Sequence, residues 1–256
     1  MNVNAMMLFD KVMNQSMERF SALSFVKKQV YIHNTEYLAR KVAYITQLYT
    51  ACFSNFGWLS KDSRFYKRIL QGNLYFGSDI NKDDSSVSKI MEYLPEQQTM
   101  TENFPLPFHI HFTILPNFCC VSGIIWKDNL ERVFICLSEC SIPRDMIENS
   151  PGSYAYLSEL LEEYDSVKHP QLRDWIKGKE LSIHKIHNDS KKYWGDSFYS
   201  HYLKIKMIGA LGDVLFTSKT LKEIAISHNF IKYNNMYKAF NRYDIDLSKI
   251  SRFAKL

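Results

Sequence analysis

"KTLKEIAISHNFIKYNNMYKAFNRY", residues 219–243, has the hydrophobic spacing of two consecutive helices separated by a short turn. Ala225 is small enough for two helices to cross closely, and Asn229 stands at the turn, where left-handed backbone geometry favours Gly or Asn. Met236 and Phe240 lie four residues apart, which predicts that they form the inward face of the second helix. The side chains predicted to point outward are long and polar: Lys232, Tyr233, Asn234, Tyr237, Lys238 and Arg242.

Such a polar face is typical of a helix that reads DNA. In a helix-turn-helix the first helix packs across the second, and the second lies in the major groove. Asn can pair bidentately with adenine, and Lys can reach guanine or phosphate. We therefore predict that Tyr233, Asn234 and Lys238 contact bases and that Arg242 contacts phosphate. A solvated helix face is the alternative for these residues, and Tyr237 alternatively packs at the rim of the helix.

The charge distribution favours the same part of the chain. The protein carries a net charge of +5 over 256 residues. Residues 1–170 contain 16 Lys and Arg against 19 Asp and Glu, a net charge of −3, whereas residues 171–256 contain 16 against 8, a net charge of +8. A basic excess confined to one region indicates a polyanionic partner for that region, most often nucleic acid.

Composition and length exclude several other classes of protein. A chain of 256 residues is long enough for two domains, and no stretch of it approaches the roughly 18 consecutive apolar residues that a membrane span needs. The first twenty residues lack the pattern of a signal peptide, so we expect a cytoplasmic protein. We expect neither an enzyme nor a cofactor or metal site, because phosphate loops, nucleophile elbows and metal quartets are missing from the sequence.

Five cysteines without a disulfide or zinc pattern are predicted to be buried free thiols: Cys52, Cys119, Cys120, Cys136 and Cys140.

The amino-terminal part, residues 1–150, is predicted to be an α+β domain with a small antiparallel sheet, serving regulation or oligomerisation. Helical periodicity covers residues 4–22 and 36–56, and alternating or apolar runs follow at 108–115, 119–126 and 132–137. His109 and His111 share one face of the first predicted strand, where exposed polar positions are favoured over a metal site. The polar stretch 77–89 is predicted to be a surface loop, and the Pro- and Gly-containing stretch 141–152 marks the domain boundary.

The carboxyl-terminal part resembles the AraC/XylS family of bacterial transcription regulators. The resemblance covers about residues 155–256 and depends on three motifs in the family's order. These motifs are Leu181-Ser182 with Ile186 and Gly195-Asp196-Ser197-Phe198, then Lys206-Met207 with Ala210, then Ile224-Ala225, Asn229-Phe230 and Met236 to Tyr243. The resemblance implies an all-α domain, residues 151–256, of two helix-turn-helix units at about 171–198 and 219–243, joined by a linker helix at 199–215.

The resemblance also implies a second reading face, on the first unit. Ser182 would cap the first recognition helix, and its outward residues would be His184, Lys185, His187, Asn188, Lys191 and Lys192. We expect Lys191, Lys192 and, on the linker helix, Lys204 to contact phosphate. Asp189 and Ser190 depart from the family pattern, since they occupy positions where the family has apolar core residues. Ile231 replaces a capping Ser, so the second recognition helix should lack a side-chain cap.

The sequence therefore predicts a DNA-binding transcriptional regulator, an activator acting with RNA polymerase. "GSYAYLSELLEEYDS" (152–166) and "DLSKISRFAKL" (246–256) resemble the branch of the family that activates type III secretion genes. That resemblance implies a virulence-gene activator with a protein coactivator or chaperone, as a monomer or homodimer. Two alternatives remain open at this point. One is a protein-binding regulator that controls a partner without binding DNA, and the other is an amino-terminal sensor of a small molecule.

Overall fold

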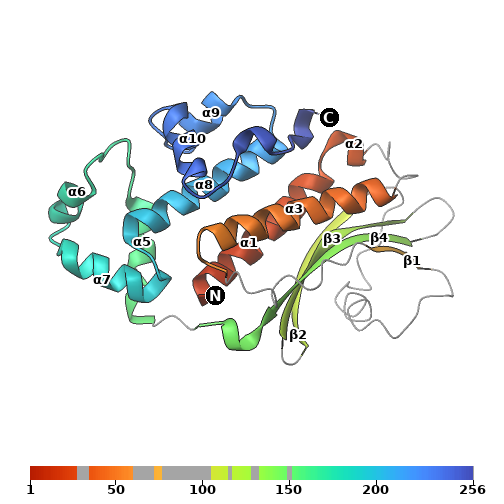
Figure 1. The fold of residues 1–256 in the computed structure, drawn as a ribbon, viewed down its shortest axis with the longest axis horizontal. Helices are drawn as coiled ribbons and strands as arrows, with labels where there is room; N and C mark the ends of the chain where they lie inside the picture. Colours follow the sequence, from red (N-terminus) through yellow and green to blue (C-terminus); the bar gives the residue numbers. More distant parts are fainter. Residues whose placement is uncertain are drawn as a thin grey trace. The chain divides into compact units, whose positions relative to one another are not determined.

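The computed structural model describes residues 1–27, 35–59, 72–76, 105–114, 117–127, 133–148 and 152–255. These residues are mostly helical, with one small antiparallel sheet (Figure 1). The chain forms two compact units, one of Phe9–Ala51 and Ser60–Met146 and the other of Met1–Leu8, Cys52–Leu59 and Ile147–Leu256. The sequence suggested a single division near residue 150, whereas the carboxyl-terminal unit also contains two segments from the amino-terminal part.

The sheet of the first unit has four strands in the order β1-β4-β3-β2, and all neighbours are antiparallel. The predicted meander is confirmed as β2 (Leu106–Ile114), β3 (Asn117–Lys127) and β4 (Val133–Pro143). The short strand β1 (Gly72–Phe76), which pairs with the far side of β4, was not predicted. Strand β3 is internal, and its side chains from Cys119 to Ile125 are buried on both faces. Alternation of buried and exposed residues is therefore lost along it.

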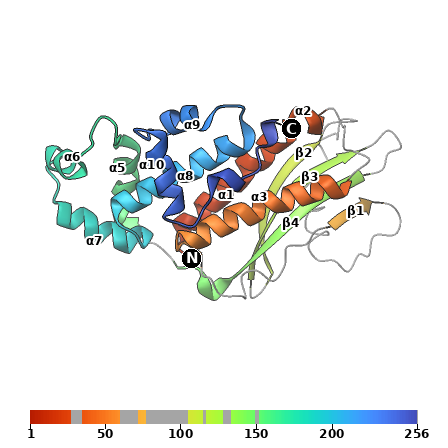
Figure 2. The ribbon, with the colours of Figure 1, turned by 45° about the horizontal axis from the view of Figure 1, so that its top comes forward.

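Two long helices accompany the sheet, as the periodicity predicted. They are α1 (Val3–Ser21) and α3 (Thr35–Asn55), and the short helix α2 (Ser24–Lys27) follows α1. Both views show α1 and α3 side by side next to the strands (Figures 1 and 2). Each helix buries a stripe with three- and four-residue spacing, which is why an amphipathic sequence becomes a helix packed on one side. Every residue expected in the stripe of α3 is buried, with Phe56 directly after the end of the helix: Leu38, Val42, Ile45, Tyr49, Cys52, Phe53 and Phe56.

His109 does not occupy the exposed position that its strand pattern predicted. Its side chain is 2% exposed, and Asp10 on α1 and Ser122 on β3 both hydrogen-bond with its ring, at 2.8 and 2.7 Å. Burial lowers the pKa of His109 below its ordinary value, against the opposing effect of the Asp10 carboxylate. His111, two residues on, is 54% exposed as predicted. The alternation of residues along a strand does not reveal which other element contacts its face. Only the tertiary structure could therefore show that His109 is buried and His111 exposed.

The second unit contains the carboxyl-terminal helices. They are α5 (Tyr156–Glu163), α6 (Leu172–Gly178), α7 (Ile183–Trp194), α8 (Phe198–Phe216), α9 (Leu221–Ser227) and α10 (Tyr233–Asn241). Short 3-10 turns lie at Arg144–Met146, Gly152–Tyr154, Leu247–Lys249 and Phe253–Lys255. Helix α8 is buried around most of its circumference, and α7, α9 and α10 pack against it. A helix buried on most of its sides forms the centre of the unit.

Three of the cysteines are buried free thiols, as predicted: Cys52, Cys119 and Cys120. Burial raises the pKa of Cys52 to about 12, so this thiol is not a reactive thiolate near neutral pH. The side chains of Cys136 and Cys140 and the predicted loop 77–89 lie outside the described residues.

Candidate nucleic-acid interface

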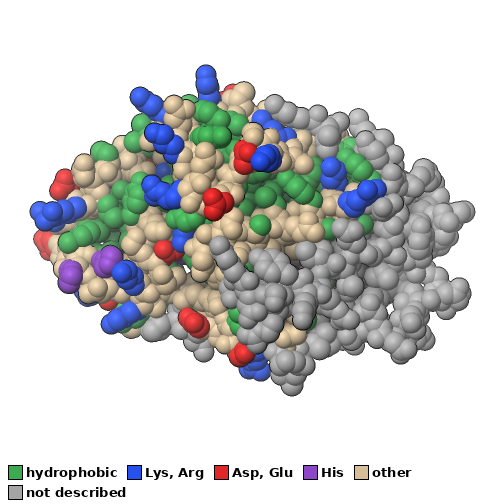
Figure 3. All heavy atoms as spheres, viewed as in Figure 1, with side chains coloured by type: hydrophobic (Ala, Val, Ile, Leu, Met, Phe, Trp, Pro, Cys, Tyr) green, Lys and Arg blue, Asp and Glu red, His purple; other side chains and the backbone are tan. Residues whose placement is uncertain are grey.

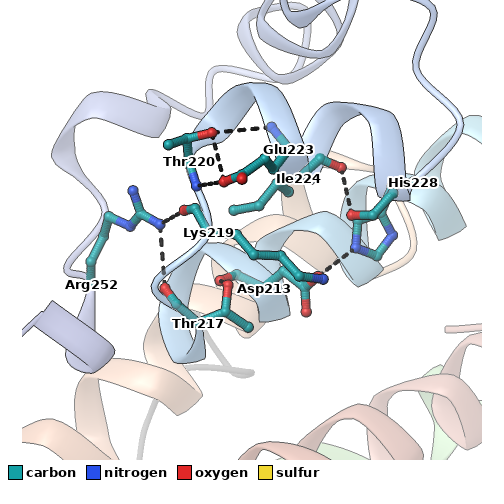
Figure 4. Close-up of polar contacts among 9 residues, drawn as sticks. Asp213, Thr217, Lys219, Thr220, Glu223, Ile224, His228 and Arg252 are labelled. Carbon is teal, nitrogen blue, oxygen red and sulfur yellow. Dashed lines mark hydrogen bonds and ion pairs between the residues drawn. The ribbon is translucent and has the colours of Figure 1, made fainter.

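Helix α9 begins where the sequence supplies a capping box. Thr220 Oγ1 accepts from the backbone N–H of Glu223 at 3.2 Å, and the Glu223 carboxylate accepts from the backbone N–H of Thr220 at 2.6 Å (Figure 4). The hydrogen bonds that the Glu223 carboxylate accepts, first from the Thr220 backbone N–H and then from the Thr220 hydroxyl, lower the pKa of Glu223. Because two otherwise unsatisfied backbone donors are paired, the start of this short helix is fixed. Its inner face then carries Ile224 and Ala225, both fully buried.

The turn between α9 and α10 has the predicted geometry. Asn229 adopts a φ of 57°, in the left-handed region. The next residue, Phe230, donates its backbone N–H to Ala225 O at 2.8 Å and is itself 5% exposed. The left-handed Asn therefore ends α9, and the buried Phe230 anchors the chain before it enters α10.

Helix α10 separates an apolar face from a polar one. Met236 and Phe240 are fully buried, as predicted, and Lys232 at its N-cap makes no side-chain capping bond, in agreement with the expected missing cap. The opposite side presents the residues predicted to face DNA: Lys232, Asn234, Lys238 and Arg242 are exposed, and Tyr233 and Tyr237 are half-buried. The two tyrosine rings lie 6.0 Å apart, so they support each other at the edge of the polar face. From Tyr233 to Arg242 the helix carries no acidic residue.

Helix α7 has the same design with local caps at both ends. Ser182 accepts from the backbone N–H of Lys185, and Gly195 closes the helix in the left-handed conformation with a φ of 74°. Ile186, Tyr193 and Trp194 are buried in an aromatic cluster with residues of α5 and α8. Like the capping Ser182, the residues predicted to point outward are all exposed: His184, Lys185, His187, Asn188, Lys191 and Lys192. Figure 3 shows Lys and Arg side chains (blue) over the surface of these carboxyl-terminal helices, with His (purple) among them.

The two polar residues at expected core positions of α7 are accommodated differently. Asp189 is half-buried, and its carboxylate accepts a hydrogen bond of 2.6 Å from the Tyr156 hydroxyl of α5. Burial and that carboxylate together raise the pKa of Tyr156, which therefore remains a donor. Ser190 is fully buried, and its Oγ has no hydrogen-bond partner among the described residues. Tyr193 and Trp194 supply the aromatic bulk that Asp189 and Ser190 cannot provide, so the helix keeps its packed side.

Lys204 is a correction to the expected phosphate contacts. Its side chain is 5% exposed and its ammonium is ion-paired with Asp196, so no phosphate can reach it in this structure. It also donates to Phe56 O at 2.6 Å. The sequence placed Lys204 on the linker helix correctly, but the buried surroundings come from residues about 150 positions earlier in the chain.

Sequence reasoning overlooked Lys206 as a site residue, although the family resemblance had already aligned it. Its ammonium donates to Asn229 O at 2.6 Å and to Ser166 Oγ at 3.1 Å, and it lies 4.5 Å from the Phe230 ring centroid. Burial lowers the pKa of Lys206 to about 8. This side chain therefore ties the central helix α8 to the turn that positions α10. A cationic residue at a fixed distance before Ala225 was the available signal.

A groove of about 310 Å³ runs beside α10 within this unit. Its walls are Ser166 and Pro170, the α8 residues Tyr199, Leu203 and Lys206, and residues of the turn and α10 including Lys238 and Arg242. Three cationic side chains and no carboxylate line it, so the groove extends the positive character of the α10 face.

Comparison with known proteins returned no relative: no protein-family profile, no curated protein and no solved structure matches this chain. Among the described residues, no helix has both the length and the apolar character needed to cross a membrane. The functional assignment therefore depends on the geometry of α7 and α10 and on the chemistry of their exposed side chains.

Proposed function

We propose that this chain is a sequence-specific DNA-binding transcriptional regulator of the AraC/XylS type, an activator. In this proposal α6–α7 and α9–α10 are two helix-turn-helix units joined by α8. Helices α7 and α10 enter successive segments of the major groove on one face of the duplex, about one turn or ~34 Å apart. Phosphate contacts from Lys191, Lys192 and Arg242 supply most of the affinity, and base contacts supply the specificity.

The observation that carries the proposal is the two-sided character of α10. Met236 and Phe240 are fully buried while Asn234, Lys238 and Arg242 on the opposite side are exposed. The preceding Asn229 turn and the tight packing of Ala225 are what a helix pair needs in order to project its second helix. Exposed cations on a stretch, Tyr233 to Arg242, that carries no acidic residue give this helix the charge that a groove lined with phosphates attracts.

Partners follow from the same function. An activator must recruit RNA polymerase, and the resemblance to the type III secretion branch suggests virulence genes and a coactivating protein or chaperone. These partners belong to the proposal. A regulator that binds only a protein partner would not need Asn234 and Lys238 to contact bases. The DNA-binding experiment therefore also decides between DNA binding and protein binding alone.

The test is selection of duplexes from a random double-stranded pool with the full-length protein, followed by binding measurements on the enriched site. Asn234→Ala and Lys238→Ala should each weaken binding by about 1–3 kcal/mol, because each removes a base contact. Asn234→Ala should also relax the preference at one base pair. Lys177→Ala is the matched control, since Lys177 is exposed on α6 outside the proposed reading faces. Absence of any enriched duplex, or equal binding by both variants and wild type, would reject the proposal.

A further inference from the structure

Lys204 lies at the meeting point of three parts of the carboxyl-terminal unit. Its ammonium pairs with Asp196, which directly follows the C-cap of α7, and donates to Phe56 O at the end of α3. The same ammonium lies 5.5 Å from the ring centroids of Trp58 and of Tyr243, which directly follows α10 and its C-cap. One buried charge therefore touches the carboxyl-terminal ends of both proposed reading helices and the segment Cys52–Leu59.

The segment Cys52–Leu59 completes this arrangement with two aromatic rings. Trp58 Nε1 donates to Asp196 Oδ2 at 3.2 Å, so the carboxylate is shared between the indole and the lysine. Phe56 contacts the Tyr243 ring edge-on, with centroids 4.9 Å apart. Trp58 also contacts the His201 ring at 5.3 Å, and His201 stacks on Trp194 of α7 at 4.1 Å. The rings thus continue from the amino-terminal segment into both helix ends.

His201 adds no competing charge to this cluster. Burial lowers its pKa to about 3, so the imidazole is neutral throughout the physiological range. Lys204 is therefore the cation that Asp196 neutralises here, with the ring faces of three aromatic residues around it.

The other amino-terminal segment, Met1–Leu8, contacts the same end of α7. Asn2 Nδ2 and Asn4 Nδ2 donate to Tyr193 O at 2.8 and 3.3 Å. Tyr193 lies in the last turn of α7, where carbonyl groups have no partner within the helix. Both amino-terminal segments of the unit therefore supply partners at the point where α7 ends and α8 begins.

We infer that Lys204, Asp196 and Trp58 form a clasp that holds α7 and α10 in one relative position, so that the amino-terminal segments complete the DNA-binding unit. This inference rests on the proposed function, in which the two helices must reach two groove segments at once. Linked binding modules gain affinity only while their geometry lets both engage, and lose it when the geometry fails. Lys204 is thus a positioning residue: it touches no DNA, but it decides whether both helices bind together.

The test compares two duplexes. The complete site is the enriched site, and the half-site is the same duplex with the base pairs read by α10 scrambled. Full-length Lys204→Met removes the charge and keeps most of the side-chain length. It should bind the complete site about tenfold more weakly while its affinity for the half-site changes less than about twofold, because the joint engagement is lost. Lys177→Met makes the same change of net charge at an exposed position and should match wild type on both duplexes.

Hydrogen exchange gives a readout that needs no DNA. Lys204→Met should raise amide exchange together at residues 52–59, in the last turn of α7 and in the last turn of α10, because all three depend on one ammonium. If the proposed function fails and wild type binds no duplex, this coupled exchange still decides the clasp. Exchange that changes at only one of the three places, or a full-site to half-site affinity ratio equal to that of wild type, would overturn the clasp while leaving DNA binding intact.

A milder variant keeps the test decisive if Lys204→Met does not fold. Trp58→Phe retains a ring but removes the N–H that Asp196 accepts. Like Lys204→Met, it should lower the ratio of the affinity for the complete site to the affinity for the half-site, by a few-fold. With Lys204→Met unfolded, an unchanged ratio in Trp58→Phe would reject the clasp.

Discussion

At the scale of single residues, the carboxyl-terminal unit is defined by a few polar groups placed inside an aromatic core. Asp189 has a hydroxyl partner in Tyr156, and Lys204 has a carboxylate in Asp196. His201 has neither: its Nδ1 is buried without a hydrogen-bond partner among the described residues, and the ring is held by stacking on Trp194. A buried group of this kind resists ionisation, so its chemistry should be visible in how stability depends on pH.

The pKa of His201 predicts acid sensitivity. The folded protein binds a proton there only near pH 3, whereas the unfolded chain binds one below its ordinary value of 6.5. The unfolded state therefore takes up the proton first, and stability falls as pH drops from 6.5 toward 3. Between pH 7 and pH 5 this group should remove about 2 kcal/mol from the free energy of unfolding.

The variant His201→Phe keeps a ring against Trp194 and abolishes the titration. Urea unfolding at pH 7, 6 and 5 should show a shallower loss of stability than in wild type, whatever the absolute stability of the variant. His169→Phe, at an exposed position, is the control and should keep the wild-type slope. If the free energy of unfolding depends on pH equally in His201→Phe and in wild type, His201 does not cause the loss of stability at acidic pH.

At the scale of elements, helix ends are fixed locally and helix contacts are not. Ser182, Thr220, Gly195 and Asn229 all have the geometry that their residue types favour, because capping depends on neighbours three or four positions away. The contact between α8 and α9 is different. Gly209 of α8 lies against the His228 ring, so that a Cβ at Gly209 would be 2.9 Å from His228 Cε1. His228 Nε2 and Lys219 Nζ both lie 3.2 Å from Asp213 Oδ2 (Figure 4). Helix propensity would favour Ala at position 209, whereas a Cβ there would lie too close to the His228 ring.

Gly209→Ala should destabilise the protein although Ala is the better helix former. The new Cβ would lie 2.9 Å from His228 Cε1, so the ring must move and weaken its bond to Asp213. We expect a net loss of about 1–3 kcal/mol in the free energy of unfolding, after a propensity gain of about 1 kcal/mol.

Two further variants make that measurement specific. Gly178→Ala, where a Cβ would meet nothing within 4 Å, should be neutral or stabilising by up to about 1 kcal/mol. Gly209→Ala combined with His228→Ala should recover part of the loss, because the clash is removed. A destabilised Gly178→Ala, or a double variant no better than the single one, would refute the packing explanation.

At the scale of the whole molecule, charge is separated along the chain. The carboxyl-terminal 86 residues hold the +8 that gives the protein its net positive charge, and the residues before them are slightly acidic. This separation confines the basic excess to residues 171–256, a distribution that favours a polyanionic partner for that part of the chain. Its quantitative consequence is the dependence of DNA binding on salt.

Each phosphate contact should contribute about 0.9 to the slope of log K against log salt concentration. Lys191→Ala with Lys192→Ala should therefore reduce the slope by about 2, with similar weakening on enriched and random duplexes. Binding titrations between about 50 and 200 mM KCl measure this slope, because phosphate contacts weaken strongly over that range of salt concentration. Lys177→Ala should leave the slope unchanged, and a slope unaffected by the double substitution would remove Lys191 and Lys192 from the phosphate contacts.

The sequence by itself determined the local features of this protein. It predicted the helices at the amino terminus, the three-stranded meander, the left-handed Asn229 and the inward Met236 and Phe240, because each follows from residues a few positions apart. The Ser182 cap was implied by the family resemblance, and the structure has it. The sequence also identified the exposed polar rows of α7 and α10, since a helix fixes which side chains share a face.

Tertiary structure alone decided the environment of the residues that meet across long separations. Lys204 was expected at a phosphate and is buried against Asp196, Phe56 and Trp58, and His109 was expected in solvent and is buried against Asp10. The recruitment of Met1–Leu8 and Cys52–Leu59 into the carboxyl-terminal unit likewise left no local signal. The physical reason is that the periodicity of a helix or strand determines which face a side chain occupies. Whether that face is buried depends on which distant segment packs against it.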